Sequence, residues 1–243
     1  MTKSLFEAIG YRLGQKAAQA KNAFDLMGGT EEDSLRAEIR LGRDLAVALL
    51  ERIPLVEENE TTRFVAQIGS WLAANVKEKK LPFSFRVMAE RESNALALPG
   101  GPVFVSWPLL EMCKGERDEI AFVLGHEMAH IVQRHCLDKI VKDAALSLLL
   151  RQSSGRHAAN AWLSKTGQQV LSSAYSRDDE LEADAFAAAL VKTAGGDALA
   201  GERLLEKFAQ LTSVQSVGTA GNYFSTHPPP LERVANLRAK KQS

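Results

Sequence analysis

The chain has 243 residues, 45% of them hydrophobic, which is enough to bury one substantial core, and we expect a single domain over residues 1–243. Lys plus Arg and Asp plus Glu balance at 30 each, so no net charge favours nucleic acid or an anionic membrane surface as a partner. The two cysteines, Cys113 and Cys136, form no C-x-x-C pair. This argues against a disulfide framework or a cysteine zinc site, and we expect two reduced, buried thiols.

Residues 1–29 are expected to form an amphipathic helix ahead of a core that spans residues 30–240. Their apolar side chains are scattered among Lys and Arg and form no continuous stretch like that of a secretory signal. Such a helix packs on its own domain or contacts a membrane surface or a partner through residues 1–27. No segment is long and apolar enough to span a bilayer. We therefore expect a soluble protein, cytoplasmic as written, and periplasmic or membrane-peripheral if a leader was removed.

Helices are predicted over most of the core. Thr30 and Asp33 form a capping box that starts a helix ending before Pro54, and Ser176 and Asp179 form a second capping box. Apolar periodicity predicts further helices over 61–79, 117–151, 176–194 and 198–211, a helical stretch that ends at 175 after a polar break over 152–160, and a basic terminal helix.

Short strands are predicted only between the helix predicted over 61–79 and the helix predicted over 117–151. Alternating apolar residues indicate strands over 83–89, 95–98 and 103–106, the last two joined by the turn Pro99-Gly100-Gly101-Pro102. The glycines belong to a turn and not to a phosphate loop, because no Lys-Ser/Thr pair or helix start follows them. The pattern predicts an α+β fold that is mostly helical, with one small sheet.

His126-Glu127-Met128-Ala129-His130 is an H-E-x-x-H motif within a predicted helix. Two histidines four residues apart lie about 40° apart around a helix and roughly 6 Å apart along it, so their imidazoles can converge on one tetrahedral zinc ion. Glu127 is rotated about 100° from His126, which allows its carboxylate to act on a water beside the metal as a general base. A catalytic zinc site of this kind needs one more protein ligand.

The helix that starts at Ser176 offers that ligand. Glu180 and Asp184 lie one helical turn apart, so one of them can bind zinc while the other accepts a hydrogen bond from a ligand imidazole. The alternative for Asp184 is an ion pair with Arg177 or Arg233. Glu182 is rotated about 200° from Glu180, and we expect it on the solvated surface.

In these residues the chain resembles the M48 family of zinc metallopeptidases. The motifs that carry the resemblance are His126-Glu127-x-x-His130, Ser176-Arg177-x-x-Glu180-x-x-Ala183-Asp184, the stretch from Asn94 to Gly101, and Thr226-His227-Pro228 with Arg233. Four ordered motifs cover roughly residues 35 to 240. The absence of transmembrane helices favours the soluble Oma1-like or BepA-like branch over the membrane-embedded members.

The resemblance implies a zincin-like (gluzincin) domain that binds one Zn2+ through His126, His130 and Glu180, with Glu127 as catalytic base. It further implies that Asp184 orients a ligand histidine and that a strand pairs with an extended polypeptide substrate, through main-chain hydrogen bonds. The residues of this strand are Asn94, Ala95, Leu96, Ala97 and Leu98.

The remaining histidines are harder to assign. His227 lies in a stiff Thr-His-Pro-Pro-Pro segment; if it reaches the metal, it either stabilises the oxyanion of the transition state or acts as a fourth ligand that keeps the enzyme latent. Arg233 either supports a carboxylate of the site or lies on a helix surface. His135 is about 140° around a continuous helix from His130 and is not expected to share the metal. No role is expected for His157.

The expected function is that of a zinc-dependent endopeptidase for unfolded or extended protein segments, in protein quality control. The competing interpretation is a zinc-fold adaptor that binds polypeptides, like a chaperone, without peptidase activity. Glu127 separates the two, because a purely structural zinc site does not need a general base.

Overall fold

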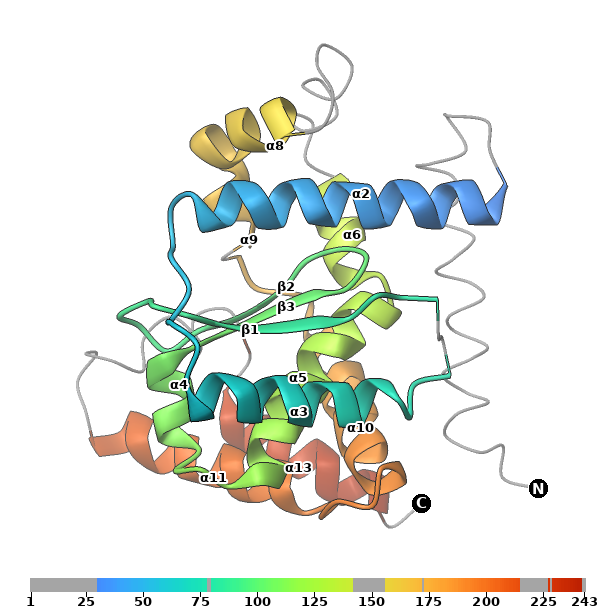
Figure 1. Ribbon diagram of the computed structural model, residues 1–243. Coiled ribbons are helices and arrows are strands. Elements are labelled where there is room, and N and C mark those ends of the chain that lie inside the picture. Colours follow the sequence, from blue (N-terminus) through green and yellow to red (C-terminus); the bar gives the residue numbers. More distant parts are fainter. Residues whose placement is uncertain are drawn as a thin grey trace.

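Helices lie on both faces of a small three-stranded sheet in the computed structural model, which describes residues 30–77, 80–141, 156–171, 173–214, 227 and 229–241 (Figure 1). The predicted α+β fold, mostly helical with one small sheet, is confirmed. The predicted N-terminal amphipathic helix lies outside the described residues. None of the helices in the described ranges is long and apolar enough to cross a membrane.

The sheet has the order β1-β3-β2, with β1 parallel and β2 antiparallel to the central strand β3. Its strands are β1 (Ser84–Met88), β2 (Ala95–Ala97) and β3 (Pro102–Ser106). The helices are α2 (Glu31–Leu50), α3 (Glu60–Ala73), α4 (Trp107–Met112), α5 (Arg117–Val132), α6 (His135–Val141), α8 (Arg156–Trp162), α9 (Gln168–Leu171), α10 (Arg177–Thr193), α11 (Ala200–Val214) and α13 (Pro230–Lys241), with a π-helical turn (Leu163–Gly167) between α8 and α9.

The two sequence-predicted helix starts are present. Thr30 and Asp33 form the capping box of α2, and the side chain of Ser176 accepts a hydrogen bond of 3.2 Å from the backbone N–H of Asp179 at the start of α10. Other boundaries differ from the predictions. The helix predicted over 61–79 ends at Ala73, α8 begins inside the predicted polar break, and α4 was not predicted.

The prediction of one long helix over 117–151 is wrong, because the chain turns between α5 and α6. Arg134 adopts a left-handed conformation with φ of 59°, which ends α5 and starts α6 in a new direction at His135. This conformation costs a non-glycine residue about 1–2 kcal/mol. Glu38, buried on α2, offsets the cost by pairing with the guanidinium of Arg134 at 3.2 Å. No Gly or Asn marks the turn, so residue patterns gave no signal for it.

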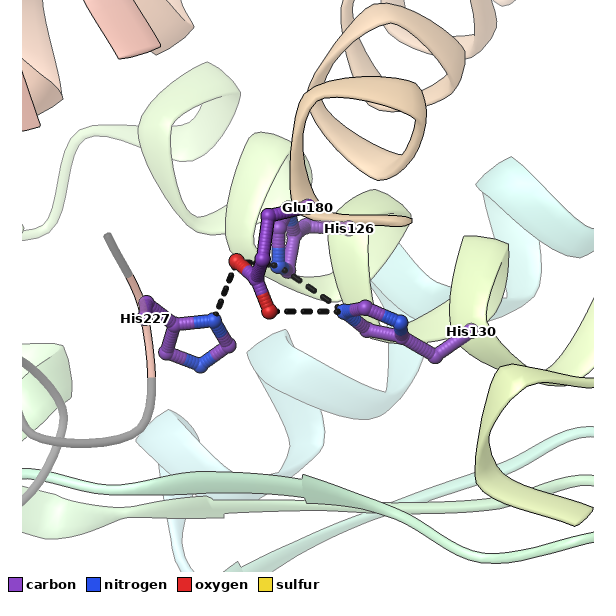
Figure 2. Close-up of side chains that lie close together, drawn as sticks. All are labelled: His126, His130, Glu180 and His227. Carbon is purple, nitrogen blue, oxygen red and sulfur yellow. Dashed lines mark hydrogen bonds and ion pairs between the residues drawn. The ribbon is translucent and has the colours of Figure 1, made fainter. Parts of the chain in front are cut away.

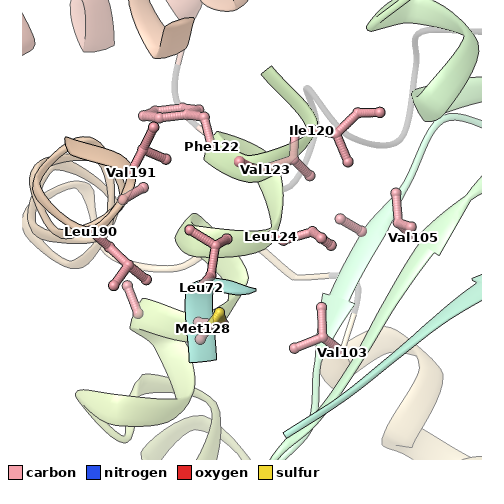
Figure 3. Close-up of a cluster of buried hydrophobic side chains, with 14 of the residues drawn as sticks. Leu72, Val103, Val105, Ile120, Phe122, Val123, Leu124, Met128, Leu190 and Val191 are labelled. Carbon is pink, nitrogen blue, oxygen red and sulfur yellow. The ribbon is translucent and has the colours of Figure 1, made fainter. Parts of the chain in front are cut away.

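The two faces of the sheet pack against different helices. Val103 and Val105 of β3 face the cluster formed with α3, α5 and α10 (Figure 3). Phe104 between them faces the cluster formed with α2, α6 and α8. This alternation follows from the two-residue repeat of a strand. Both faces of the sheet are therefore buried, which explains the continuous apolar run in β3.

Helix α5 lies at the centre of the larger cluster. Every residue from Glu119 to Ile131 is buried, because α5 packs against α3, α10, α11 and the sheet. Gly125 allows the closest part of this packing: a Cβ atom there would lie 3.3 Å from Cα of Ala187 on α10. The close approach brings the polar side chains of α5 and α10 within reach of one another.

The cysteines behave as the sequence predicts. Cys113 and Cys136 are free and buried; Cys113 directly follows α4, and Cys136 lies on α6. Burial raises the pKa of the Cys113 thiol to about 12. Both thiols therefore act as small apolar groups of the core.

We expect Glu38→Leu to lower the free energy of unfolding by about 3 kcal/mol, since it leaves Arg134 without its buried partner and removes the acceptor, Oε1 at 3.3 Å, of the Gly100 backbone N–H. Glu38→Gln, which keeps an acceptor, should cost about half as much. Urea unfolding measures both. Glu32→Gln is the matched control, because its pair with Arg36 on the same helix is exposed and is worth less than about 0.5 kcal/mol. Equal effects of Glu38→Leu and the control would contradict this role of Glu38.

Candidate metal centre

Four buried side chains from three parts of the chain converge below α10 (Figure 2). His126 and His130 come from α5, Glu180 from α10, and His227 from the segment ahead of α13. The Nε2 atoms of His126 and His130 lie 3.2 Å apart, and they lie 3.5 Å and 3.6 Å from the two carboxylate oxygens of Glu180. The three residues predicted to bind zinc therefore point their ligand atoms at one another.

This donor set fits a zinc ion. Ligands placed tetrahedrally at roughly 2.0–2.2 Å from zinc lie about 3.4 Å from one another, close to the separations among His126, His130 and Glu180. Oε1 of Glu180 is buried without a hydrogen-bond partner, which is costly for a carboxylate oxygen unless a cation occupies the space it faces. Nitrogen and carboxylate donors also suit zinc.

The charges around the four side chains favour a cation at their centre. Burial and Arg233 lower the pKa of His126, but its two carboxylate neighbours, Asp184 and Glu180, outweigh them and raise it to about 9. Burial opposes ionisation of Glu180 as well, yet His227 and His126 hold its pKa far below the usual range. Glu180 thus stays ionised inside the core, and its negative charge favours a cation beside it.

Asp184 contacts Nδ1 of His126, the ring nitrogen that does not face His130. Its Oδ1 accepts a hydrogen bond from Nδ1 of His126 at 2.9 Å, which leaves Nε2 free to act as a ligand. Arg233 from α13 donates to both carboxylate oxygens, from Nε at 2.9 Å and from Nη2 at 2.6 Å. Burial raises the pKa of Asp184, but Arg233 and His126 outweigh it and lower the pKa to about 2. The two alternatives left open for Asp184 are therefore both realised, since it contacts the histidine and the arginine.

Arg233 is one of the largest fully buried side chains in the described residues, so it is not a surface arginine. Arg177, the other candidate partner of Asp184, is exposed and pairs with Glu232 of α13 instead. Both contacts connect α13 to α10. Helix α13 thus contributes to the support of His126 although it lies far from α5 in the sequence.

Two further residues contact His130 that residue patterns did not identify. Nδ1 of His135 lies 3.0 Å from Nδ1 of His130, and the ring of Tyr175 stacks on the imidazole of His130 at a centroid distance of 3.9 Å and an angle of 11°. His135 reaches this position only because of the turn at Arg134, which a continuous helix does not contain. The same turn explains why Glu182 is wrongly predicted: it is not on the solvated surface but half-buried, with Oε2 3.9 Å from Nε2 of His135.

Glu127 follows the first ligand histidine and is also fully buried. Its Oε1 atom has no hydrogen-bond partner, and burial raises its pKa to about 7 although His126 acts in the opposite direction. A carboxylate with a pKa near neutrality is suited to accept and release a proton. His157, for which no role is expected, lies exposed on α8.

The family model described as "Peptidase family M48" matches residues 59–241, which include every side chain of the candidate metal centre. The chain belongs to peptidase family M48. The resemblance stated from the sequence motifs is thereby confirmed, and with it the zincin-like character of the fold.

Several curated relatives of this M48 chain are metallopeptidases. A mitochondrial metalloendopeptidase OMA1 from Schizosaccharomyces pombe is 33% identical over 73% of this chain and 52% of its own length. A beta-barrel assembly-enhancing protease from Escherichia coli is 28% identical over 84% of this chain and 44% of its own length. The metalloprotease YcaL of Escherichia coli is 29% identical over 72% of this chain and 67% of its own length. The chain spans about half the length of the first two relatives.

We expect Asp184→Asn to weaken zinc binding about 10- to 100-fold, because the neutral amide no longer stabilises positive charge on His126 and leaves Arg233 without its carboxylate partner. A competition titration with a chromophoric chelator measures the dissociation constant. Lys192→Gln on the same helix serves as control, since that side chain is exposed and its substitution should leave zinc binding unchanged. Identical affinities for the two variants would exclude a supporting role for Asp184.

Proposed function

We propose that this M48 chain is a zinc-dependent endopeptidase that binds one zinc ion through His126, His130 and Glu180 and uses Glu127 as its general base. The observation that carries the proposal is the convergence of the three donors beside a buried carboxylate with an unpartnered oxygen. The names of the OMA1 and beta-barrel assembly-enhancing relatives support a role in protein quality control, on unfolded or extended segments. We also propose that residues 30–240 act as one catalytic unit, because the sheet joins both hydrophobic clusters.

The residues of the centre divide the chemistry among them. A zinc ion held there polarises a peptide carbonyl and lowers the pKa of a water molecule. Glu127 accepts the proton of the attacking water and passes it to the nitrogen of the leaving amine. Its pKa of about 7 allows both transfers near neutral pH. Asp184 keeps a proton on Nδ1 of His126 so that Nε2 stays available as a ligand.

Strand β2 is the proposed binding edge for the substrate. In the described sheet, β2 pairs with β3 alone. Two backbone hydrogen bonds flank β2, one from the N–H of Ser106 to the carbonyl of Asn94 and one from the N–H of Leu98 to the carbonyl of Pro102, and both lie on the β3 side. Antiparallel pairing then directs the N–H and C=O groups of Ala95 and Ala97 away from β3. An extended peptide can pair with these groups irrespective of its sequence.

His227 is the proposed control element of the centre. Its Nδ1 lies 2.6 Å from Oε2 of Glu180, and burial lowers its pKa to about 4 although Glu180 acts in the opposite direction. A neutral imidazole beside a ligand carboxylate is suited to bind zinc and unsuited to donate to an oxyanion as a cation. We therefore favour the interpretation in which His227 completes the ligand set and keeps the enzyme latent until it moves aside.

The adaptor without peptidase activity remains the second candidate, and Glu127→Gln separates the two. We expect this variant to retain full zinc binding, because Glu127 is not a ligand, and to cleave unfolded casein at least about 100-fold more slowly than the wild type. Zinc content and the rate of casein fragmentation are the measurements. His157→Gln, an exposed histidine on α8, is the control and should cleave like the wild type. Equal cleavage by Glu127→Gln, or none by the zinc-loaded wild type, would refute the peptidase proposal.

His227→Ala should raise the initial rate of casein cleavage several-fold, since it removes a neutral group that competes for the fourth position beside Glu180. Zinc affinity should fall at the same time, because one donor is lost. A lower rate with unchanged zinc affinity would instead assign His227 to transition-state stabilisation. Unchanged rate and affinity would remove it from the centre altogether.

A further inference from the structure

The ligand histidine His130 has a neighbour on the side that faces away from the metal centre. Its Nδ1 lies 3.0 Å from Nδ1 of His135, and Nε2 of His135, on the far side of that ring, lies 3.3 Å from Oδ1 of Asp179 and 3.9 Å from Oε2 of Glu182. His130, His135 and Asp179 thus contact one another in sequence, and the series ends at Asp179 in the first turn of α10. His126 has the corresponding support from Asp184 and Arg233, with a carboxylate in direct contact.

The protons in this series can be counted. Two nitrogens at 3.0 Å form a hydrogen bond only if one proton lies between them. Nε2 of His130 faces Nε2 of His126 and Oε1 of Glu180, and it can bind a metal only if it carries no proton. The proton of His130 must then be on Nδ1, from which it is donated to Nδ1 of His135. His135 in turn carries its own proton on Nε2, directed at the carboxylate of Asp179.

On these grounds we propose that His135 and Asp179 form a positioning relay that holds His130 in the tautomer and orientation required of a zinc ligand; this inference rests on the proposed zinc site. His135 accepts a hydrogen bond at Nδ1 from the N–H of His130, and Asp179 fixes His135 by accepting a hydrogen bond from its Nε2–H. Neither residue touches the metal or the substrate. The relay acts through His130 alone.

Each member of the relay is held in place by a separate local structure. The left-handed turn at Arg134, secured by Glu38, starts α6 so that His135 faces back toward α5. Asp179 lies in the first turn of α10, where its Oδ2 atom accepts a hydrogen bond of 2.6 Å from the hydroxyl of the N-cap residue Ser176. The carboxylate therefore contacts the N-cap side chain with one oxygen and faces His135 with the other. The start of the helix that carries Glu180 thus also orients the second histidine.

Tyr175 restrains the remaining freedom of His130. Its ring lies parallel to the imidazole of His130, in contact with one face, while His135 contacts the edge. A ring that is stacked on one face and hydrogen-bonded at Nδ1 has little freedom to rotate about its Cβ–Cγ bond. Tyr175 directly precedes Ser176, the N-cap of α10, so the same segment supplies Tyr175 and Asp179.

The residues His135, Asp179 and Glu182 also form a group that is compatible with a second metal ion. A second metal ion at this group is incompatible with a zinc ion bound to His130. A metal on Nε2 of His135 moves the proton of His135 to Nδ1, and the contact of 3.0 Å then moves the proton of His130 to Nε2, its ligand atom. The relay and a second ion therefore predict different zinc stoichiometries, one against two.

The test compares zinc binding by substitutions of His135 in the full chain, with the dissociation constant from chelator competition and the stoichiometry from metal analysis. His135→Phe removes the acceptor and should raise the dissociation constant about 10- to 100-fold. His135→Gln places its amide at the Nε2 position and should weaken binding to a similar extent. His135→Asn retains an acceptor near the Nδ1 position and should stay within about threefold of the wild type. His157→Phe, an exposed histidine, should bind like the wild type.

Unfolding curves identify variants that do not fold. If His135→Phe does not fold, the comparison of His135→Gln with His135→Asn, both polar replacements, still tests the relay. Nitrogen-15 NMR of the zinc-loaded wild type should place the proton of His130 on Nδ1. Wild-type affinity in His135→Phe or His135→Gln, or a stoichiometry of two that falls to one, would overturn the relay. No zinc binding by the wild type would instead refute the proposed function, so the two failures are distinct.

Discussion

The close packing of α5 against α10 is the contact on which the rest of the structure depends. Together with α3, α11 and the sheet, α10 buries α5 on all sides, and Gly125 permits the two backbones to approach where Ala187 of α10 lies opposite. Larger side chains at this crossing would press against the backbone of α10 and push the two helices apart. Apolar packing thus sets the spacing of the polar centre, and the sheet and α3 supply the other wall of the same cluster.

Burial of so many ionisable groups is costly unless each has a partner. In the described residues, the buried ionisable groups of the centre lie next to groups of opposite charge or to histidines. Glu180 lies among three histidines and Asp184 lies between His126 and Arg233, while one carboxylate oxygen of Glu180 and one of Glu127 have no hydrogen-bond partner. These two unsatisfied oxygens belong to the proposed zinc ligand and the proposed general base, as expected when local stability is exchanged for function.

Much of the centre was predictable from the sequence because its residues lie on well-signalled helices. The H-E-x-x-H spacing and the capping box at Ser176 place His126, His130 and Glu180 on known faces, and the three do converge. The contribution of His135 was not predictable, since it depends on a left-handed turn at Arg134 that tertiary contacts with Glu38 stabilise. Likewise, periodicity shows that α13 is helical, but only the tertiary structure buries Arg233 against Asp184.

Arg233 also affects when the centre can form. Its contact with His126 joins residues that are 107 positions apart, and α13 is the last helix of the described chain to be synthesised. While α13 is still missing, Asp184 lacks the guanidinium that keeps it ionised inside the core, and His126 lacks a firmly held partner. During synthesis the support of His126 is therefore completed only after the H-E-x-x-H helix and α10 have been made, so the geometry of the candidate centre depends on the last helix of the described chain.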